Sequence, residues 1–335
     1  MAADPSIPLR PAADLEAQDG QRSGISTMMD SIAARRAGRG GLSSYARRDR
    51  LLAVLLLLPA VLTVFLVMIL PLGFALYASL FNYHLGQESR MAFVFLGNYV
   101  GFFADPVALQ ALFNTVVFTL LSLGFGISIG VGISVLLKNT DPRAANFLRA
   151  IFAMPVLISP IIVSLIWRYM YDPTFGLVYF LLDRIGLGAF PGLSSSSTAL
   201  ICIVITDVWH TTPFIILVAS AGLTVIPDEL YEAAHIDGAT ALQTLFRITL
   251  PLLTKVLVVL LLIRGTDAFR TFDLIYGLTG GGPANSTTSL SIYAYKEAFE
   301  NNQMGFGMAA SIITLICLVG LFGPLLRNSA RRDDE

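Results

Sequence analysis

Residues 228–239 read Asp228-Glu229-Leu230-Tyr231-Glu232-Ala233-Ala234-His235-Ile236-Asp237-Gly238-Ala239. This stretch is polar, yet each apolar block beside it is long enough to cross a bilayer, which takes about 20 residues. A charged segment between two spans must lie at the water interface or against another protein. Pro227, Asp228 and Glu229 favour the start of a helix, because negative charge in the first turn suits the helix dipole. Gly238 allows a backbone bend that other residues resist.

A second short helix is expected directly after the polar stretch. Leu242, Leu245 and Phe246 fall at the i, i+3, i+4 spacing of an amphipathic helix. Pro251 is expected to end that helix and to open the next span, because proline lacks the N–H that a continuing helix needs. The loop between the two spans therefore covers residues 227–250.

The composition indicates an integral membrane protein. Of the 335 residues, 55% are hydrophobic and 13% are charged, whereas about 25% of a soluble globular chain is charged. The net charge of −1 gives no reason to expect a nucleic-acid partner. Both cysteines, Cys202 and Cys317, lie far apart in apolar blocks, which indicates small core residues and neither a disulfide nor a metal site.

Six membrane-spanning helices are predicted, so the fold class is an all-α membrane protein. The expected spans are about Leu51–Leu80, Leu109–Leu137, Phe147–Tyr171, Ala199–Val225, Leu252–Leu278 and Phe306–Leu326. Residues 51–326 then form the transmembrane domain. Residues 1–50 are polar, lack an apolar run and are predicted to be a largely disordered tail. Residues 327–335 form a second tail.

Two of the spans carry residues that affect helix packing or continuity. Gly126 and Gly130 in the second span have the GxxxG spacing of a close helix–helix seam, although glycine is also common in membrane helices in general. Pro155 and Pro160 lie inside the third span. A bilayer tolerates them where neighbouring groups satisfy the freed carbonyls.

The distribution of lysine and arginine predicts the orientation of the spans, since cytoplasmic loops carry the excess of positive charge. One set of loops and tails holds Arg10, Arg22, Arg35, Arg36, Arg39, Arg47, Arg48, Arg50, Lys138, Arg143, Arg149, Arg247, Lys255, Arg327, Arg331 and Arg332. The opposite set holds only Arg90, Arg168, Arg184 and Lys296. Both termini and the 227–250 loop are therefore predicted to be cytoplasmic.

The fifth predicted span carries four charges at intervals of three residues, Arg264, Asp267, Arg270 and Asp273. A charge near the middle of a bilayer costs about 3 kcal/mol or more unless it is paired or faces water. These residues either line a water-filled cavity that binds a hydroxyl-rich solute, or form a ladder of ion pairs against another helix. The cavity candidates of this span are Arg264, Asp267, Ala268 and Thr271, whereas Asp273 is expected to be structural.

The fourth predicted span adds further candidates for a solute pathway, namely Trp209 and Thr212. An indole face beside polar groups suits a sugar ring. The alternative for Trp209 is the aromatic belt at a membrane interface. His210 alone is more typical of a structural hydrogen bond than of a ligand.

The sequence lacks motifs for nucleotide binding, metal binding and catalysis. It contains no Gly-x4-Gly-Lys-Ser/Thr loop for ATP phosphates. No cluster of His, Cys and carboxylates has metal-ligand spacing, and no nucleophile–base pair is evident, so no catalytic residue is assigned. The glycine-rich segment Gly280-Gly281-Gly282-Pro283 lacks a lysine and is interpreted as a turn.

The polar stretch and the residues after it follow the pattern Glu-Ala-Ala, three residues, Gly, nine residues, Ile-x-Leu-Pro. The matching residues are Glu232, Ala233, Ala234, Gly238, Ile248, Leu250 and Pro251. This pattern resembles the Glu-Ala-Ala loop of permease subunits of ATP-driven (ABC) importers, where the loop is a coupling helix seated in a cleft of the ATPase. The resemblance implies that the residues coupling this chain to an ATPase are Glu232, Ala233, Ala234, Asp237 and Gly238.

Further stretches within residues 51–326 resemble the maltose-type carbohydrate importers. They are Phe95-Leu96-Gly97-Asn98-Tyr99, Asp105-Pro106, Ala111-Leu112-Phe113-Asn114-Thr115, Pro155 through Trp167-Arg168, Ala221-Gly222-Leu223, Ile226-Pro227, Phe272-Asp273-Leu274-Ile275-Tyr276, Tyr295, Ala298-Phe299 and Gly305-Phe306-Gly307. The Thr-Gly-Gly-Gly-Pro cluster that starts at Thr279 resembles the first, maltose-F-like permease of such a pair.

The resemblance implies a type I ABC importer permease with six transmembrane helices in the bacterial cytoplasmic membrane. Its implied partners are a second, maltose-G-like permease, an ATPase dimer that binds ATP and Mg, an extracytoplasmic solute-binding protein and the lipid bilayer. No cofactor is expected in this chain itself. The family's solute cavity lies in the span that matches residues 264–271 here.

The solute is expected to be a sugar or a related hydroxyl-rich molecule. The first outer loop is short and holds no inserted domain, and the cavity span carries extra charges, so maltose itself is not favoured. A disaccharide, a polyol or a glycerol phosphate remains open. The alternative class is an ion-coupled secondary carrier that acts without an ATPase; such a carrier would need an internal inverted repeat, and none is clear in the sequence.

Overall fold

The computed structural model describes residues 52–86, 91–186 and 190–333, with side chains described to residue 327. The predicted tail at residues 1–50 lies outside the described residues. The chain divides into two units, residues 1–72 and 73–335, and each is described by itself.

The first span is a helix from Leu52 to Ser79, and residues 52–72 of it make up the described part of the smaller unit. It includes a π-helical segment, η1 (Phe65–Ile69), followed by α2 (Leu70–Ser79). None of its most apolar 18-residue window is buried.

The larger unit is organised around two helices that pack along their length, α4 (Pro106–Lys138) and α8 (Ala199–Leu223). Pro106 opens α4 and the carboxylate of Asp105 accepts from the N–H of Val107, so the start of α4 follows ordinary capping rules. Of the apolar window of α8, 67% is buried, more than in the other candidate spans of the described chain. Thus α8 is the central helix of the unit.

The predicted glycine seam in α4 is confirmed. A Cβ on Gly130 would lie 2.6 Å from Cγ2 of Ile215 in α8, and one on Gly126 would lie 3.2 Å from Cδ1 of the same residue. Gly124 and Gly132 have no such neighbour. The seam therefore depends on the two glycines that the GxxxG spacing selects.

The third predicted span is not a continuous helix, which corrects the expectation of one helix from Phe147 to Tyr171. The chain forms α5 (Pro142–Ala153), a short 3₁₀ turn η3 (Pro155–Leu157) and α6 (Pro160–Met170). The helical segments on the two sides of the break are bent by 94°. Pro155 and Pro160 each begin a new segment, because their rings exclude the hydrogen bonds that would continue the helix before them. The described chain therefore has five apolar helices of spanning length, or six if this bent pair counts as one.

The fifth span also differs from the prediction at both ends. A single helix runs from Ala241 to Phe269, comprising α10 (Ala241–Thr244), the π-helical segment η5 (Leu245–Thr249) and α11 (Leu250–Phe269). Pro251 does not end it. The wider π turn just before Pro251 relieves the clash between a proline ring and the carbonyl one turn earlier. A π-helical segment likewise precedes Pro71 in the first span.

The end of α11 corrects the expected ladder of four charges. The helix ends at Phe269, and Asp273 begins a separate short helix, α12 (Asp273–Thr279). Asp273 is exposed. Arg264 lies about 8 Å from the end of α11 at ~1.5 Å per residue. It lies level with Ser122, the central residue of α4, because both contact one side chain of α8.

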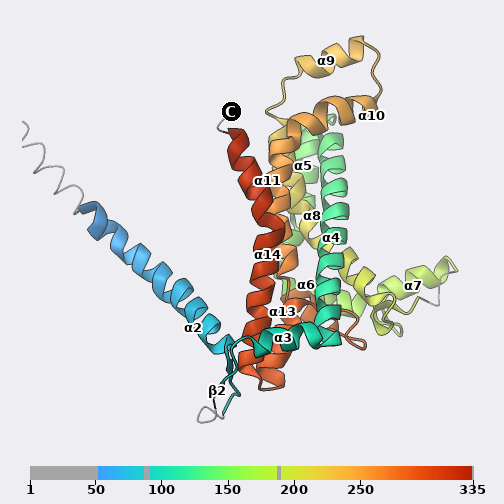
Figure 1. Cartoon of the computed structure of the whole chain (residues 1–335). Coiled ribbons are helices and arrows are strands. Elements are labelled where there is room, and N and C mark those ends of the chain that lie inside the picture. The colour runs from blue at the N-terminus through green and yellow to red at the C-terminus, as the bar shows by residue number, and fades with distance from the viewer. Residues whose placement is uncertain (1–51, 87–90, 187–189, 334–335) are drawn as a thin grey trace, which may run out of the picture. The chain divides into compact units, whose positions relative to one another are not determined.

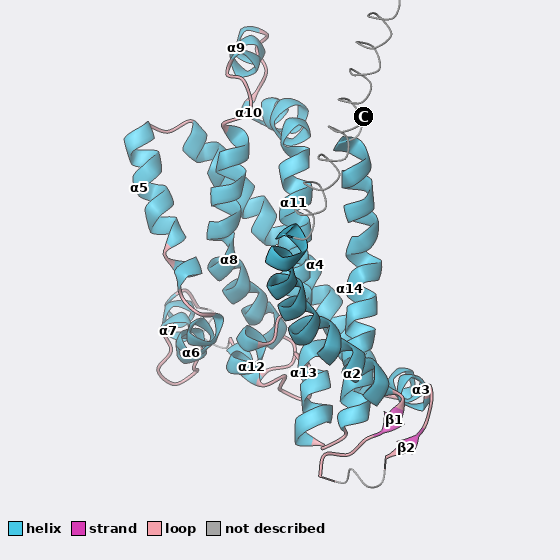
Figure 2. Cartoon of the chain, turned by 90° about the vertical axis from the view of Figure 1, so that its left-hand side faces the viewer, coloured by secondary structure: helices cyan, strands magenta, loops and turns pink. Residues whose placement is uncertain are grey.

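The end of the unit opposite the 227–250 loop is built from short elements, as Figures 1 and 2 show. They are β1 (Phe81–Asn82), β2 (Ala92–Phe93), α3 (Gly97–Ala104), α7 (Leu177–Arg184), η4 (Gly192–Ser194), α13 (Leu290–Tyr295) and η6 (Lys296–Glu300). β1 and β2 form an antiparallel pair, Phe81 opposite Phe93.

The second half of the segment between the turn at Gly280 and the last helix is part of the core. Leu290, Ile292 and Tyr293 of α13 are buried. The hydroxyl of Tyr293 donates to Asp105 at 2.5 Å, and burial raises the pKa of Tyr293 above its usual value. The last helix, α14 (Met304–Asp333), packs against α13 and α11 and continues past the predicted end of the sixth span at Leu326.

Candidate functional site

The stretch at residues 228–239 forms a short helix, α9 (Glu229–Ile236), at one end of the larger unit. Figure 1 shows α9 and α10 beyond the ends of the long helices, at the end where α14 also finishes. Glu232, Ala233 and Asp237 are exposed there, and Ala234 is turned inward with 7% of its surface exposed. Four of the five predicted coupling residues, Gly238 included, thus lie on a free surface.

Gly238 supplies the bend that the sequence predicted. Its φ is +71°, a left-handed conformation that side chains with a Cβ rarely adopt. No neighbouring atom lies within 4 Å of where its Cβ would be, so the backbone angle and not space selects glycine. The chain then enters α10 through a capping box, in which the side chains of Thr240 and Gln243 each bond the other's backbone N–H.

One lysine that the sequence motifs did not single out attaches α9 to the end of α4. Nζ of Lys138 lies 3.1 Å from Oδ1 of Asp228 and 3.9 Å from the ring centroid of Tyr231, and it donates to the carbonyl of Leu223 at 3.5 Å. The Tyr231 hydroxyl accepts from Thr249 at 3.4 Å. These contacts connect the helix to α4, α8 and η5 together. We call Lys138, Asp228 and Tyr231 the anchor of the loop.

Large apolar side chains are exposed around α9 and α10. Ile236 is 84% exposed, Leu242 67% and Phe246 64%. The predicted amphipathic face of residues 242–246 is therefore present, and nothing in the described chain covers it. Apolar side chains gathered at a polar end of a membrane protein mark a contact surface for another protein.

A buried polar cluster lies in the middle of the bundle. Arg264 of α11 is 8% exposed and donates from Nη2 to Oδ2 of Asp207 in α8 at 3.2 Å. Asp207 is 4% exposed, and the hydroxyl of Ser122 in α4 donates to the same oxygen. Of the two interpretations of Arg264, the geometry in this chain is that of an ion pair against another helix. Sequence reasoning did not connect Asp207 with it, although an aspartate in an apolar helix needs such a cation.

The next charges along α11 point away from this cluster. Nη2 of Arg270 lies 2.8 Å from Oδ1 of Asp267, and their side chains are 70% and 42% exposed. The hydroxyl of Thr271 donates to the carbonyl of Asp267 at 2.9 Å. Asp267, Arg270 and Thr271 therefore form a polar surface at the end of α11, which we call the α11 polar end.

The other predicted pathway residues are not brought together. Ala268 is buried, and so is Thr212, whose hydroxyl has no partner within the described residues. Trp209 is 41% exposed and meets Trp167 edge-on, with ring centroids 5.4 Å apart. Trp209 thus belongs to an aromatic pair on the outer surface of α8 and α6.

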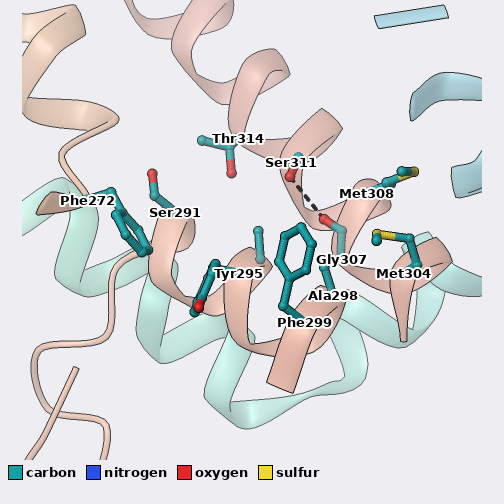
Figure 3. A pocket seen from close by; sticks show the side chains of 11 residues that line it. Phe272, Ser291, Tyr295, Ala298, Phe299, Met304, Gly307, Met308, Ser311 and Thr314 are labelled. Atoms are coloured by element: carbon teal, nitrogen blue, oxygen red, sulfur yellow. Dashed lines mark hydrogen bonds between the residues drawn. The ribbon is translucent and has the colours of Figure 1, made fainter. Parts of the chain in front are cut away.

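A cavity of about 510 Å³ opens near the α11 polar end, between α13, η6 and α14. Figure 3 shows the rings of Phe272, Tyr295 and Phe299 on one side and Ser311 and Thr314 on the other. The Ser311 hydroxyl donates to the carbonyl of Gly307 at 3.0 Å. None of the sequence-predicted pathway residues lines this cavity.

The structure has a bent third span and an exposed loop helix between the fourth and fifth spans. The sequence also matches one protein family over nearly its whole length. Residues 41–332 match the family described as "Binding-protein-dependent transport system inner membrane component". The chain belongs to this family. It is therefore a transport subunit and not an enzyme, and a multi-pass protein of the cytoplasmic membrane.

Sequence similarity to characterised permeases supports the membership in this transport family. The chain is 37% identical over 287 residues to the trehalose/maltose transport system permease protein MalF of Thermococcus litoralis, covering 86% of this chain and 96% of that protein. It is 33% identical over 283 residues to the sulfoquinovosyl glycerol transport system permease protein SmoG of Agrobacterium fabrum, covering 84% and 92%. It is 30% identical over 272 residues to the sn-glycerol-3-phosphate transport system permease protein UgpA of Yersinia pestis, covering 81% and 91%. The predicted resemblance to carbohydrate-importer permeases is confirmed.

The fold of this transport family is seen in a solved structure as well. A chain of a bacterial ABC transporter involved in the import of the acidic polysaccharide alginate superposes with a TM-score of 0.73 at 24% identity, covering 87% of this chain and 98% of that one. The predicted type I importer permease fold is confirmed at this level.

Proposed function

We propose that this chain is one of two permease subunits of an ATP-driven importer for a sugar or a related hydroxyl-rich solute, and that it forms half of the translocation pathway. A separate ATPase dimer drives it through the 227–250 loop, by way of Glu232, Ala233, Ala234, Asp237 and Gly238. The observation that carries the proposal is the exposed α9 helix, attached to the bundle by its anchor and surrounded by uncovered apolar side chains.

The exposed side of α9 and α10 supports an ATPase as the occupant. Ile236, Leu242 and Phe246 are uncovered, and Glu232 and Asp237 stand among them, so the surface offers an apolar centre with polar contacts beside it. Because Lys138, Asp228 and Tyr231 tie α9 to α4 and to the start of the fifth span, a displacement of α9 reaches both helices. ATP and Mg bind to the ATPase and not to this chain.

The α11 polar end supports a pathway on that side of the bundle. An exposed ion pair on a membrane helix is costly against lipid, so it faces water or another protein. We assign Asp267 and Thr271 of the α11 polar end to the pathway. The other predicted pathway residues, Trp209, Thr212, Arg264 and Ala268, lie outside this polar end and are not assigned to it. The opposite wall comes from the second, maltose-G-like permease.

The solute class is drawn from the relatives, whose names refer to trehalose and maltose, sulfoquinovosyl glycerol and glycerol 3-phosphate. All three kinds of solute are hydroxyl-rich, and two are anionic. An anionic solute suits a pathway at the α11 polar end, which contains Arg270. An extracytoplasmic binding protein delivers the solute. The 227–250 loop and both termini are cytoplasmic, which is supported by the charge asymmetry and by the shared end of α9 and the C-terminal part of α14.

Purification tests the proposal as a whole. The tagged chain is isolated in detergent from the membranes of its own cells, together with the proteins bound to it, and the complex is reconstituted. We expect an ATPase subunit and a second permease to co-purify, and solute uptake to require ATP. Uptake by this chain in the absence of any ATPase, driven by an ion gradient, would instead establish the secondary-carrier alternative.

Loss of the anchor is expected to reduce coupling between ATP hydrolysis and transport. In Lys138→Met the ion pair and the cation–π contact are both lost, and α9 is freed from α4. The amount of solute imported per ATP is expected to fall about threefold to tenfold, since a partly buried cation–π contact and ion pair together contribute on the order of 1 kcal/mol. Uptake and hydrolysis are measured in the same proteoliposomes.

Lys138→Arg is the matched variant, because it keeps the charge and can retain both contacts. It should restore most of the coupling ratio. An unchanged ratio in Lys138→Met would show that the anchor has no part in coupling.

Substitutions at the α11 polar end are expected to weaken solute binding and to leave ATP hydrolysis unchanged. Asp267→Asn removes one acceptor charge while α11 keeps its shape, so the KM for transport should rise by about tenfold, the usual effect of losing a hydrogen bond to a charged group. Basal ATPase activity should be unchanged. The control is Asp273→Asn, an exposed aspartate one helix further along; a KM that responds equally to both substitutions would count against the assignment.

A further inference from the structure

A second, smaller cavity lies at the α9 end of the bundle, away from the α11 polar end. It has a volume of about 340 Å³ and is enclosed by the ends of α4 and α8, by one face of α5 and by the start of the 227–250 loop. Figures 1 and 2 show these helix ends side by side. The polar side chains that line it and matter below are Lys138, Asn146, Arg149, Ser220 and Asp228.

Two hydrogen-bond donors of this cavity have no partner within the described residues. Nε of Arg149 is buried and unpaired, while Nη1 of the same guanidinium donates to Oδ1 of Asn146 at 3.0 Å. The Oγ of Ser220 is also buried and unpaired, in a residue that is 7% exposed. A buried polar group without a partner costs about 1–3 kcal/mol. Both residues line the same cavity, so an acceptor bound there would offset this cost.

The neighbouring hydroxyls do not supply that partner. Ser134 and Thr224 also line the cavity, but each donates to a carbonyl of its own helix. The free donors come from two helices, Arg149 from α5 and Ser220 from α8. A ligand with several acceptor oxygen atoms would satisfy both.

The charges in the cavity favour an anion. Lys138 and Arg149 are the cations and Asp228 is the carboxylate, and Asp228 is paired with Lys138 at 3.1 Å. The positive charge of Arg149 is left without a carboxylate partner among the described residues. A guanidinium with free N–H groups matches the oxygen atoms of a phosphate group better than any neutral acceptor.

We propose that this cavity binds a phosphate group, held by Arg149 and Ser220 with Lys138 at its edge. The phosphate belongs to a small phosphorylated compound or to the headgroup of an anionic phospholipid. The site is separate from the pathway and from the exposed face of α9, and binding to it can be measured whether or not the chain transports solute.

Binding of two probes tests the site in the purified transporter complex. Inorganic phosphate is titrated by calorimetry at constant ionic strength, with the nucleotide sites filled by a non-hydrolysable ATP analogue. Phosphatidylglycerol is tested in nanodiscs of phosphatidylcholine with and without it, and retained lipid is identified by native mass spectrometry. The variants are Arg149→Gln and Ser220→Ala, with Arg143→Gln as control, because Arg143 is an exposed arginine of α5 that does not line the cavity.

We expect Arg149→Gln to weaken binding at least about tenfold, since a charge-assisted hydrogen bond is lost, and Ser220→Ala to weaken it about threefold. Arg143→Gln should bind as the parent does, and basal transport should be unchanged in all three. If the two cavity variants lose binding of inorganic phosphate, the source of the phosphate group is a small compound. If they lose only the binding of phosphatidylglycerol, the source is a lipid headgroup. Should Arg149→Gln fail to fold, Ser220→Ala carries the test. Absence of binding by both probes, or equal binding by all variants, would overturn the proposal.

Discussion

Gly238→Val is expected to leave the membrane domain folded and inserted but to abolish most of the coupling between ATP hydrolysis and transport. Gly238 has a φ of +71°, and a β-branched residue there is strained by about 1–3 kcal/mol. The loop relieves the strain by changing the angle between α9 and α10, so α9 no longer presents its surface as it does now. Solute uptake should fall at least about tenfold, because a strain of ~1.4 kcal/mol changes a population tenfold.

Two controls separate this effect from general damage. Gly238→Asn should recover much of the uptake, since asparagine tolerates the left-handed conformation. Gly86→Val places the same residue at a glycine with φ +80° and open space around it, in the segment that follows β1 and not in the 227–250 loop. Uptake and ATP hydrolysis are measured together in proteoliposomes. Normal uptake by Gly238→Val would show that the bend is not needed for coupling.

Arg264→Met is expected to destabilise the helix bundle strongly. It leaves Asp207 buried without its cation, and removing one partner of a buried ion pair costs about 3–5 kcal/mol. The midpoint of thermal unfolding of the purified protein in detergent should fall by several degrees, and the yield of folded protein should fall with it.

The double variant Arg264→Met with Asp207→Leu tests the pair itself. Replacing both charges by apolar groups removes the unpaired carboxylate, so much of the lost stability should return. Arg270→Met is the matched control at the end of the same helix, because Arg270 is exposed and its ion pair with Asp267 lies at the surface. A midpoint in Arg264→Met equal to that of Arg270→Met would show that the buried pair does not stabilise the bundle.

The features that were predicted correctly depend on residues close together in the sequence. Gly238 is required by its own φ, and the glycines at 126 and 130 share one helix face, so spacing alone finds them. The long apolar blocks likewise mark spans, because a bilayer demands about 20 apolar residues wherever they occur. Two of the outcomes that differed from prediction lie at prolines. Pro155 and Pro160 break the third span, whereas Pro251 leaves its helix intact because a π turn precedes it, and local propensity does not distinguish these outcomes.

The partners of charged groups were decided by the packing of helices that are far apart in the sequence. From the sequence, Arg264 suited a cavity and an ion pair equally; the structure shows that α8 places Asp207 beside it. Lys138 belongs to no motif, and its role follows from the end of α4 lying next to Asp228 and Tyr231. The amino-acid sequence alone was enough to establish a membrane protein, its spans, and an exposed loop with the Glu-Ala-Ala pattern, since hydrophobicity and backbone angles are properties of short segments. Which charges are buried, which face outward and which donors stay unpaired follows only from how the helices rotate against one another, because that rotation is chosen by contacts summed over the whole bundle.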